Sequence, residues 1–398
     1  MNLLMTVREG RKTRLPVAPS GMKKRFLILL TLFLTYGCGS SSFEPTPVPP
    51  GSSLTTTESA FQQAVLDTFE AQNLPAVAAG LWQPGRQPFL LLLGEADMNT
   101  GRAPTATDSF RIGSVTKSFT VTLILQLAEE GALSLQDPIG DYIPNIQNSN
   151  ATLEQLANMT SGIFNYTENQ QFVELFVSDF ARVWTNQQLI EYANDGSPYF
   201  LPGLSWYYSN TNTVALGMVV EQVTGNSLAE EISSRLAAPL GLQNTVYPPT
   251  ADMPVPYAAG YAVVDVGEVE EFTRTHPSSS AGSGALVSTL EDLAVWGRAL
   301  GRGELLSEES FNRQIRMIST DSCPTCPEYD GYGMGIGELD GWLGHTGDYI
   351  GYQALVMFDP LSEATVVILV NQKDFTQRVH YPTDMFREFI RIQSSMSR

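Results

Sequence analysis

The sequence has few of the side chains that bind metals most readily. Its 398 residues include three histidines and three cysteines, and no His-Glu-x-x-His motif occurs. The pair Cys323-x-x-Cys326 has no second cysteine pair to complete a zinc site. Gly-x-Ser-x-Gly is also absent, which argues against the nucleophile elbow of a Ser-His-Asp hydrolase. We therefore expect no metal and no cofactor.

Basic residues are scarce outside the N-terminal segment. Seven of the 23 Lys and Arg residues, but one of the 42 Asp and Glu residues, precede Cys38, which leaves 16 basic against 41 acidic and a net charge of −25. Such a surface repels phosphate backbones, so we expect no nucleic-acid partner. With 43% hydrophobic and 16% charged residues, the composition is that of a globular protein.

The N-terminal segment contains an apolar run, Phe26–Leu34, that is too short to cross a membrane. A basic Met-Lys-Lys-Arg sequence starting at Met22 precedes it, which predicts a secretory signal peptide over 1–37, with Met22 as an alternative start. The Gly-Cys junction resembles a bacterial lipoprotein processing site and predicts a lipid on Cys38; plain secretion is the alternative. The Ser/Pro-rich residues 38–53 would tether an exported protein to a bacterial membrane, in the periplasm or at the cell surface.

The two remaining cysteines, Cys323 and Cys326, lie in a Ser-Cys-Pro-Thr-Cys-Pro loop. An exported protein meets an oxidising environment, which favours a disulfide. A thioredoxin-like redox motif would need a strand-helix-strand context that this loop lacks. We predict a disulfide that closes the loop locally.

Hydrophobic patterns predict strands near both ends of the chain and helices in the middle. The predicted strands are Ala76–Trp82, Phe89–Leu93, Tyr332–Gly337, Gly341–His345, Tyr352–Phe358 and Thr365–Asn371. The predicted helices at the two ends of the chain are Thr57–Asn73 and 382–395, and another runs from Ser114 to Gly131. The fold class is therefore α/β (α+β), an antiparallel sheet built from both chain ends and flanked by helices. We predict one catalytic domain over 54–398, with an α/β part at 54–130 and 282–398 and an all-helical insertion at 131–281.

Ser114 and Lys117 stand one turn apart at the start of the apolar central helix. Burial would lower the pKa of the lysine, which could then act as a base toward the serine hydroxyl. The free N–H groups at a helix start suit a developing oxyanion. Taken alone, the spacing would occur by chance roughly one time in five, and an ordinary helix with a serine near its start is the alternative.

Two further motifs follow in order, Tyr208-Ser209-Asn210 and His345-Thr346-Gly347. Together with Ser114-x-x-Lys117 they resemble the motif set of the serine β-lactamase and penicillin-binding-protein superfamily. The Tyr-x-Asn and His-Thr-Gly forms are similar to its class C β-lactamase and D-alanyl-D-alanine carboxypeptidase branch. The resemblance covers roughly 55–395 and includes the segments Phe110–Gly113, Leu135–Ile139, Met159–Gly162, Pro202-Gly203 and Ser288–Leu293.

The resemblance implies a role for each residue of the first two motifs. Ser114 would be the acylated nucleophile and Lys117 its base. Tyr208 would shuttle protons to the leaving group and the deacylating water, and we expect the nearby ammonium to lower its pKa; a packed aromatic is the alternative. Asn210 would hold Lys117 and the substrate amide.

The third motif is expected to accept substrate as an added strand at the sheet edge. Thr346 would bond the substrate carboxylate or acyl chain, and Gly347 would allow close backbone approach. The oxyanion hole would combine the N–H groups of Ser114 and Asp348. The Asp348 side chain, which replaces a small hydroxyl residue, would repel a substrate carboxylate or face away. His345, which replaces the usual lysine, is expected to titrate near neutrality.

These motifs predict an exported, monomeric serine hydrolase that forms an acyl-enzyme on Ser114. A D-alanyl-D-alanine carboxypeptidase-like peptidase or a β-lactamase-related hydrolase fits best, with peptidoglycan peptides or small molecules as substrates and β-lactams as acylating ligands. A family esterase for short acyl esters and a non-catalytic penicillin-binding or sensor lipoprotein are the alternatives. The other histidines, His276 and His380, are expected at the surface.

Overall fold

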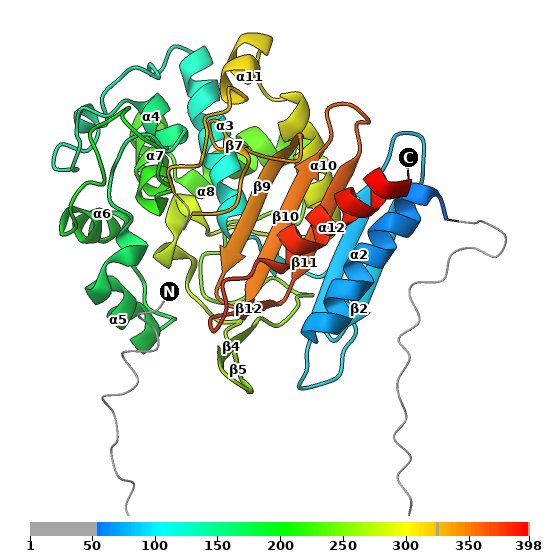
Figure 1. Cartoon of the computed structure of the whole chain (residues 1–398). Coiled ribbons are helices and arrows are strands. Elements are labelled where there is room, and N and C mark those ends of the chain that lie inside the picture. The colour runs from blue at the N-terminus through cyan, green and yellow to red at the C-terminus, as the bar shows by residue number, and fades with distance from the viewer. Residues whose placement is uncertain (1–53, 324–325, 397–398) are drawn as a thin grey trace, which may run out of the picture.

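A seven-stranded antiparallel sheet forms the centre of the part of the protein that the computed structural model describes, residues 54–323 and 326–396 (Figure 1). The predicted signal peptide, Cys38 and the tether to residue 53 lie outside the described residues. The strands, in spatial order, are β2 (Phe89–Gly94), β1 (Ala76–Trp82), β11 (Thr365–Val370), β10 (Tyr352–Phe358), β9 (Trp342–Tyr349), β8 (Gly337–Leu339) and β7 (Gly331–Tyr332). Val77 of β1 lies opposite Val370 of β11, so both ends of the chain contribute to one sheet. The predicted mixed fold is confirmed.

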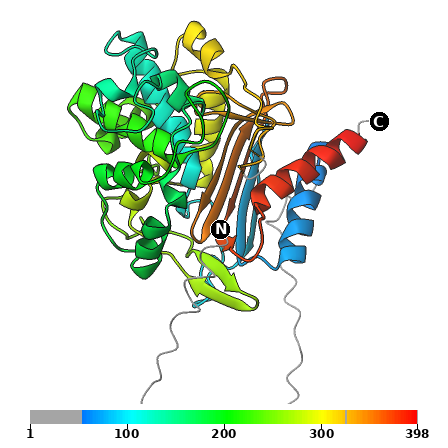
Figure 2. The ribbon, with the colours of Figure 1, turned by 60° about the vertical axis from the view of Figure 1, so that its left-hand side comes forward.

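Two helices cover one face of the sheet, α2 (Thr56–Gln72) and α12 (Tyr381–Met396). Figure 2 shows them on this face and the helices from the middle of the chain on the other. The fully buried Phe389 of α12 meets Phe61 of α2 with ring centroids 5.5 Å apart. These aromatic side chains hold the N-terminal and C-terminal helices together over the sheet.

The opposite face carries α3 (Thr116–Glu129), which is buried nearly all round because its sequence is apolar on every side. It packs against α7 (Asn210–Thr224), while α10 (Leu290–Arg302) packs against the sheet. The remaining helices are α4 (Leu153–Ala157), α5 (Gln170–Ser178), α6 (Asn186–Asn194), α8 (Leu228–Glu231), α9 (Ala238–Leu240) and α11 (Glu308–Gln314). None of the helices within 54–323 and 326–396 is long and apolar enough to span a membrane.

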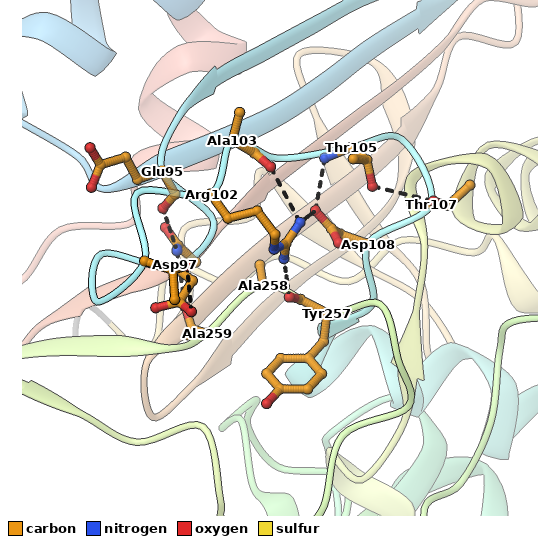
Figure 3. Close-up of polar contacts among 12 residues, drawn as sticks. Glu95, Asp97, Arg102, Ala103, Thr105, Thr107, Asp108, Tyr257, Ala258 and Ala259 are labelled. Atoms are coloured by element: carbon orange, nitrogen blue, oxygen red, sulfur yellow. Dashed lines mark hydrogen bonds and ion pairs between the residues drawn. The ribbon is translucent and has the colours of Figure 1, made fainter.

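The segment between β2 and α3 is fixed by a polar cluster around Arg102 (Figure 3). Its guanidinium pairs with the buried carboxylate of Asp108 at 3.0 Å and donates to the carbonyl of Tyr257. Asp108 also accepts the backbone N–H of Thr105 at 2.8 Å. The cluster therefore anchors the chain that leads to Ser114 against the loop before β4 (Tyr261–Asp265).

The prediction of an all-helical insertion is wrong at its end. Tyr261–Asp265 (β4) and Glu268–Glu271 (β5) form an antiparallel hairpin, and β4 also pairs with β12 (Gln372–Asp374) in a second, smaller sheet. The glutamates of β5 obscured the strand pattern, although Gly267, with φ of 74°, suits the tight turn.

The predicted strand Tyr332–Gly337 is also wrong, because the chain turns between β7 and β8. Gly335 has φ of 64°, and a Cβ atom built on it would lie 2.6 Å from the Cβ of Val121. This close approach to α3 requires glycine at the turn. The neighbouring strand β9 starts close to its predicted position but continues beyond His345 to Tyr349.

We expect Phe389→Ala to lower the free energy of unfolding by about 3–5 kcal/mol, because it leaves a cavity beneath α2 and α12. Urea denaturation followed by circular dichroism would measure the change. Leu361→Ala is the control, since that side chain is 95% exposed and should change stability by less than about 0.5 kcal/mol. Equal effects of the two substitutions would contradict this account of the helix packing.

Candidate active site

Lys117 is the buried centre of the candidate site. A short strand, β3 (Phe110–Arg111), leads into a 3-10 turn that carries Ser114 and continues as α3. The Nζ atom of Lys117 lies 2.8 Å from Ser114 Oγ, 2.7 Å from Asn210 Oδ1 and 2.8 Å from the carbonyl oxygen of Ser283. The lysine has no exposed surface, and burial lowers its pKa well below the usual 10.5.

These contacts match the donors and acceptors of a neutral amine. The Asn210 Oδ1 and Ser283 carbonyl oxygens can only accept hydrogen bonds, so they take the two N–H groups of an uncharged lysine. The remaining lone pair is then left for the hydroxyl of Ser114. The pair therefore has the geometry of a base poised to remove the serine proton.

Tyr208 lies beside this pair, with Lys117 Nζ 4.9 Å from the centre of its ring. Burial raises the pKa of Tyr208 well above 10, and Ser114 opposes this rise without reversing it. The expected lowering of its pKa is therefore wrong, because desolvation of the phenolate outweighs any help from a lysine that is itself held neutral. The raised pKa keeps its hydroxyl protonated, so Tyr208 remains a proton donor beside Ser114.

Asn210 is the first residue of α7, directly after the segment that carries Tyr208. Its Nδ2 atom donates to Thr167 Oγ1 at 3.2 Å, which orients the amide so that Oδ1 faces Lys117. Its backbone N–H donates to Asn165 Oδ1 at 3.2 Å. The structure thus brings the first and second motifs together, and the loop at 165–168 fixes the asparagine.

The third motif lies on β9, directly against the Ser114 turn. A Cβ atom on Gly347 would lie 2.0 Å from the carbonyl oxygen of Ile112, and one on Gly113 would lie 2.8 Å from the backbone nitrogen of Asp348. This contact requires glycine on both sides. It brings the backbone of Asp348 next to that of Ser114, the pair expected to form the oxyanion hole.

Tyr329 fixes the middle residue of this motif. Its hydroxyl accepts the backbone N–H of Thr346 at 2.8 Å and lies 2.7 Å from Thr346 Oγ1. Thr346 is largely buried, at 9% exposure. The tyrosine belongs to none of the three motifs, so no pattern in the sequence marks it as part of the site.

His345 does not titrate near neutrality, contrary to expectation. The imidazole has no exposed surface, and its nitrogens lie 3.1 Å from the Tyr329 hydroxyl and 3.0 Å from the Tyr332 hydroxyl. Burial, together with Lys117, lowers the pKa of His345 to about 3. The ring is therefore a neutral interior group, and it lies out of reach of a substrate.

The carboxylate of Asp348 pairs with Lys373 of β12. The lysine side chain is 6% exposed and the aspartate side chain 46% exposed. Asp348 thus neither turns fully away nor carries an uncompensated charge. Lys373 lies 25 positions after Asp348 in the sequence, and no spacing connected it to the third motif.

His276 and His380, expected at the surface, are both half-buried. His380 Nε2 lies 3.0 Å from the carbonyl oxygen of Gly347, and burial lowers the pKa of His380. His276 Nδ1 lies 2.8 Å from Ser278 Oγ. No group of three or more His, Cys, Asp or Glu in the described parts of the chain is arranged to hold a metal ion.

A disulfide joins Cys323 and Cys326, whose Cα atoms lie 5.4 Å apart. The Sγ atom of Cys326 also accepts the backbone N–H of Tyr208 at 3.3 Å. The bond therefore closes a loop that supports the second motif, a role that the sequence did not indicate.

Comparison with known proteins identifies relatives over most of the chain. The protein-family model described as Beta-lactamase matches residues 60–384. Penicillin-binding protein 4* of Bacillus subtilis (strain 168) is 28% identical over 308 residues, which are 71% of this chain and 65% of that protein. The Beta-lactamase of Escherichia coli (strain K12) is 25% identical over 279 residues, 68% of each chain. The chain thus spans just under two thirds of the length of the Bacillus protein.

Solved structures share the fold. A D-stereospecific amidohydrolase from Streptomyces sp. is 30% identical with a TM-score of 0.72, covering 83% of this chain and 97% of that one. The D-amino acid amidase from Ochrobactrum anthropi SV3 complexed with D-phenylalanine is 24% identical with a TM-score of 0.74, covering 84% and 99%. Because the D-amino acid amidase is 24% identical to this chain, the similarity to it concerns the fold alone.

We expect kcat/KM to rise with pH as Lys117 loses its proton. Because burial lowers the pKa of Lys117, the protonated, inactive form should dominate only well below pH 10.5, and the raised pKa of Tyr208 should prevent a loss of activity up to about pH 10. A pH profile of ester hydrolysis would measure this, and a flat profile over about pH 5 to 9 would contradict the role of Lys117.

Lys117→Met should lower kcat/KM by about 10²- to 10⁴-fold, because it removes the base that accepts the serine proton.

Proposed function

This chain belongs to the β-lactamase family, and on that premise we propose that it is a serine hydrolase that cleaves amide bonds of D-amino-acid derivatives through an acyl-enzyme on Ser114. The observation that carries the proposal is the buried lysine whose amine lies 2.8 Å from the Ser114 hydroxyl. Its neutral form supplies the base that a serine nucleophile needs. The similarity to Penicillin-binding protein 4* and to the D-stereospecific amidohydrolase from Streptomyces sp. supports the substrate class.

The first half of the reaction follows from the contacts of Lys117. The amine takes the hydroxyl proton as Ser114 Oγ bonds to the substrate carbonyl carbon, and the carbonyl oxygen becomes an oxyanion facing the N–H groups of Ser114 and Asp348. Tyr208 then donates its proton to the departing amine, and the C–N bond breaks. The lysine ammonium returns a proton to the phenolate of Tyr208, so both groups recover their starting forms.

The second half releases the acyl group by hydrolysis. Lys117, neutral again, accepts a proton from water, and the resulting hydroxide oxygen bonds to the acyl carbon. The ester bond to Ser114 Oγ breaks, and the serine oxygen takes the proton from the lysine. The net change is one amide and one water converted to an acid and an amine.

The charges around the third motif favour amides over substrates with a free carboxylate. His345 is neutral and buried, so it offers no cation at the position that carries lysine in many relatives of this kind. Lys373 is already paired with Asp348. A D-alanyl-D-alanine carboxypeptidase is the second candidate, supported by the similarity to Penicillin-binding protein 4*.

We further propose an exported location, since the Cys323–Cys326 disulfide suits an oxidising compartment.

We expect a fluorophosphonate probe to label the protein and Ser114→Ala to abolish the label, because the probe needs an activated serine. Gel fluorescence would measure it, with the exposed Ser197→Ala as the matched control. Equal labelling of wild type and Ser114→Ala would refute the assignment of Ser114 as the nucleophile.

In the same preparation, the D-amide of phenylalanine should be hydrolysed at least about 10-fold faster than the L-amide, a D-alanyl-D-alanine peptide or nitrocefin.

A further inference from the structure

His380 links the C-terminal helix to the third motif. It directly precedes α12, and the backbone N–H of Thr383 donates to its carbonyl oxygen at 3.0 Å and to its Nδ1 atom at 3.3 Å. The Thr383 hydroxyl lies 2.8 Å from the same nitrogen. At the other end of the ring, Nε2 lies 3.0 Å from the carbonyl oxygen of Gly347 in β9. One imidazole therefore contacts both the first turn of α12 and the strand beside Ser114.

The partners of the ring determine which nitrogen carries the hydrogen. A backbone N–H can only donate, so Nδ1 accepts, and a backbone carbonyl can only accept, so Nε2 donates to Gly347. Burial lowers the pKa of His380, which keeps the ring neutral and Nδ1 free of a proton. The carboxylates of Asp348 and Glu328 raise this pKa and the ammonium of Lys373 lowers it, without reversing the effect of burial.

The carbonyl that His380 binds belongs to the same peptide group as the N–H of Asp348. Because a peptide group is planar, a hydrogen bond that fixes the direction of the carbonyl also fixes the direction of this N–H. The bond also polarises the amide and makes its N–H a stronger donor. A Cβ atom on Gly113 would lie 2.8 Å from the nitrogen of Asp348, so this peptide lies directly against the turn that carries Ser114.

The backbone at Gly347 gains an anchor from this contact. Strand pairing places Gly347 opposite Ala354 of β10, and the close approach to Ile112 requires glycine. Glycine restricts its own backbone less than any other residue. The donors of a catalytic site must be held within about 10–20° of the productive direction. The hydrogen bond from His380 comes from α12 and limits the tilt of the peptide in addition to the strand pairing.

We propose that His380 is a positioning residue for the oxyanion hole, whose Nε2–H holds and polarises the Gly347–Asp348 peptide so that the Asp348 N–H stabilises the oxyanion. The inference rests on the proposed acyl-enzyme function of Ser114. His380 acts through the peptide group, and its own bonds are unchanged by the reaction. The start of the C-terminal helix is thereby part of the support of the active site.

Two substitutions separate the two ends of the imidazole. The asparagine side chain ends near the position of Nδ1, so His380→Asn keeps an acceptor for the Thr383 N–H but has no donor that reaches Gly347. The glutamine side chain extends to the position of Nε2, so His380→Gln keeps that donor. His276→Asn is the matched control, because His276 is also half-buried and its Nδ1 accepts the backbone N–H of Ser278.

The first readout is the second-order rate constant for fluorophosphonate labelling of Ser114, which depends on the oxyanion hole but not on the choice of substrate. His380→Asn should lower it about 10-fold, less than the roughly 10²- to 10³-fold effect of removing an oxyanion-hole donor. His380→Gln and His276→Asn should stay within about twofold of the wild type. The Tm should follow the opposite order, unchanged in His380→Asn and lower by about 2 °C in His380→Gln, because asparagine is the better helix cap.

The second readout is the phosphorus NMR resonance of the phosphonyl adduct on Ser114. The phosphoryl oxygen of the adduct occupies the oxyanion hole, so its hydrogen bond from Asp348 affects the resonance. We expect the resonance to move in His380→Asn and to keep its wild-type position in His380→Gln and His276→Asn. A loss of folding stability alone would not move it in this pattern.

The outcomes separate this proposal from the one on which it rests. A wild type that fails to label at Ser114 would overturn both. Normal labelling of the wild type with an unchanged rate or resonance in His380→Asn would overturn the positioning role alone. Equal losses in the Asn and Gln variants would assign His380 a purely structural role and would also overturn it. A loss in His380→Asn at preserved Tm, with recovery in His380→Gln, would support it.

Discussion

The burial of one lysine is the constraint on which the rest of the site depends. A charged Lys117 without exposed surface would be costly, and its surroundings offer no carboxylate among its hydrogen-bond partners. The protein instead supplies two acceptor oxygens and leaves the lone pair of a neutral amine for Ser114. Asn210 must be oriented to provide one of these oxygens, and the loop at 165–168 provides that orientation. The base and the residue that orients it are therefore parts of one hydrogen-bonded unit.

Much of the sheet could be predicted from the sequence because its strands are short apolar runs between turn residues. β1 and β10 occupy the predicted ranges, and β11 and α12 differ only at their ends. The hairpin of β4 and β5 could not be predicted in the same way, since one strand is largely glutamate and lies at the surface. Strand pairing there depends on β12, a partner more than a hundred residues away in the sequence, and such pairing leaves no local pattern.

The site was predictable where chemistry imposes a spacing. Ser114 and Lys117 are one helical turn apart, and the later motifs follow in a known order. The charge states of the site residues were harder to predict from the sequence, because a pKa depends on burial and on partners distant in the sequence. His345 and Tyr208 both differ from expectation for this reason, since desolvation is the largest cause of the pKa shift at each. Tyr329 and Lys373 were missed because each contacts the third motif only after folding.

The pairing of β1 with β11 also constrains when the site can form. Ala76 donates its backbone N–H to the side chain of Asn371, which lies 295 positions later in the chain. Bringing the ends of so long a loop together lowers the conformational entropy of the chain before the stabilising strand contacts form. Folds rich in such long-range pairings therefore form slowly. Ser114 emerges early during synthesis, but the strand that supports its oxyanion hole joins the sheet only when the last quarter of the chain is present. Ser114 is therefore synthesised long before the active site can assemble, and acyl transfer requires a nearly complete polypeptide.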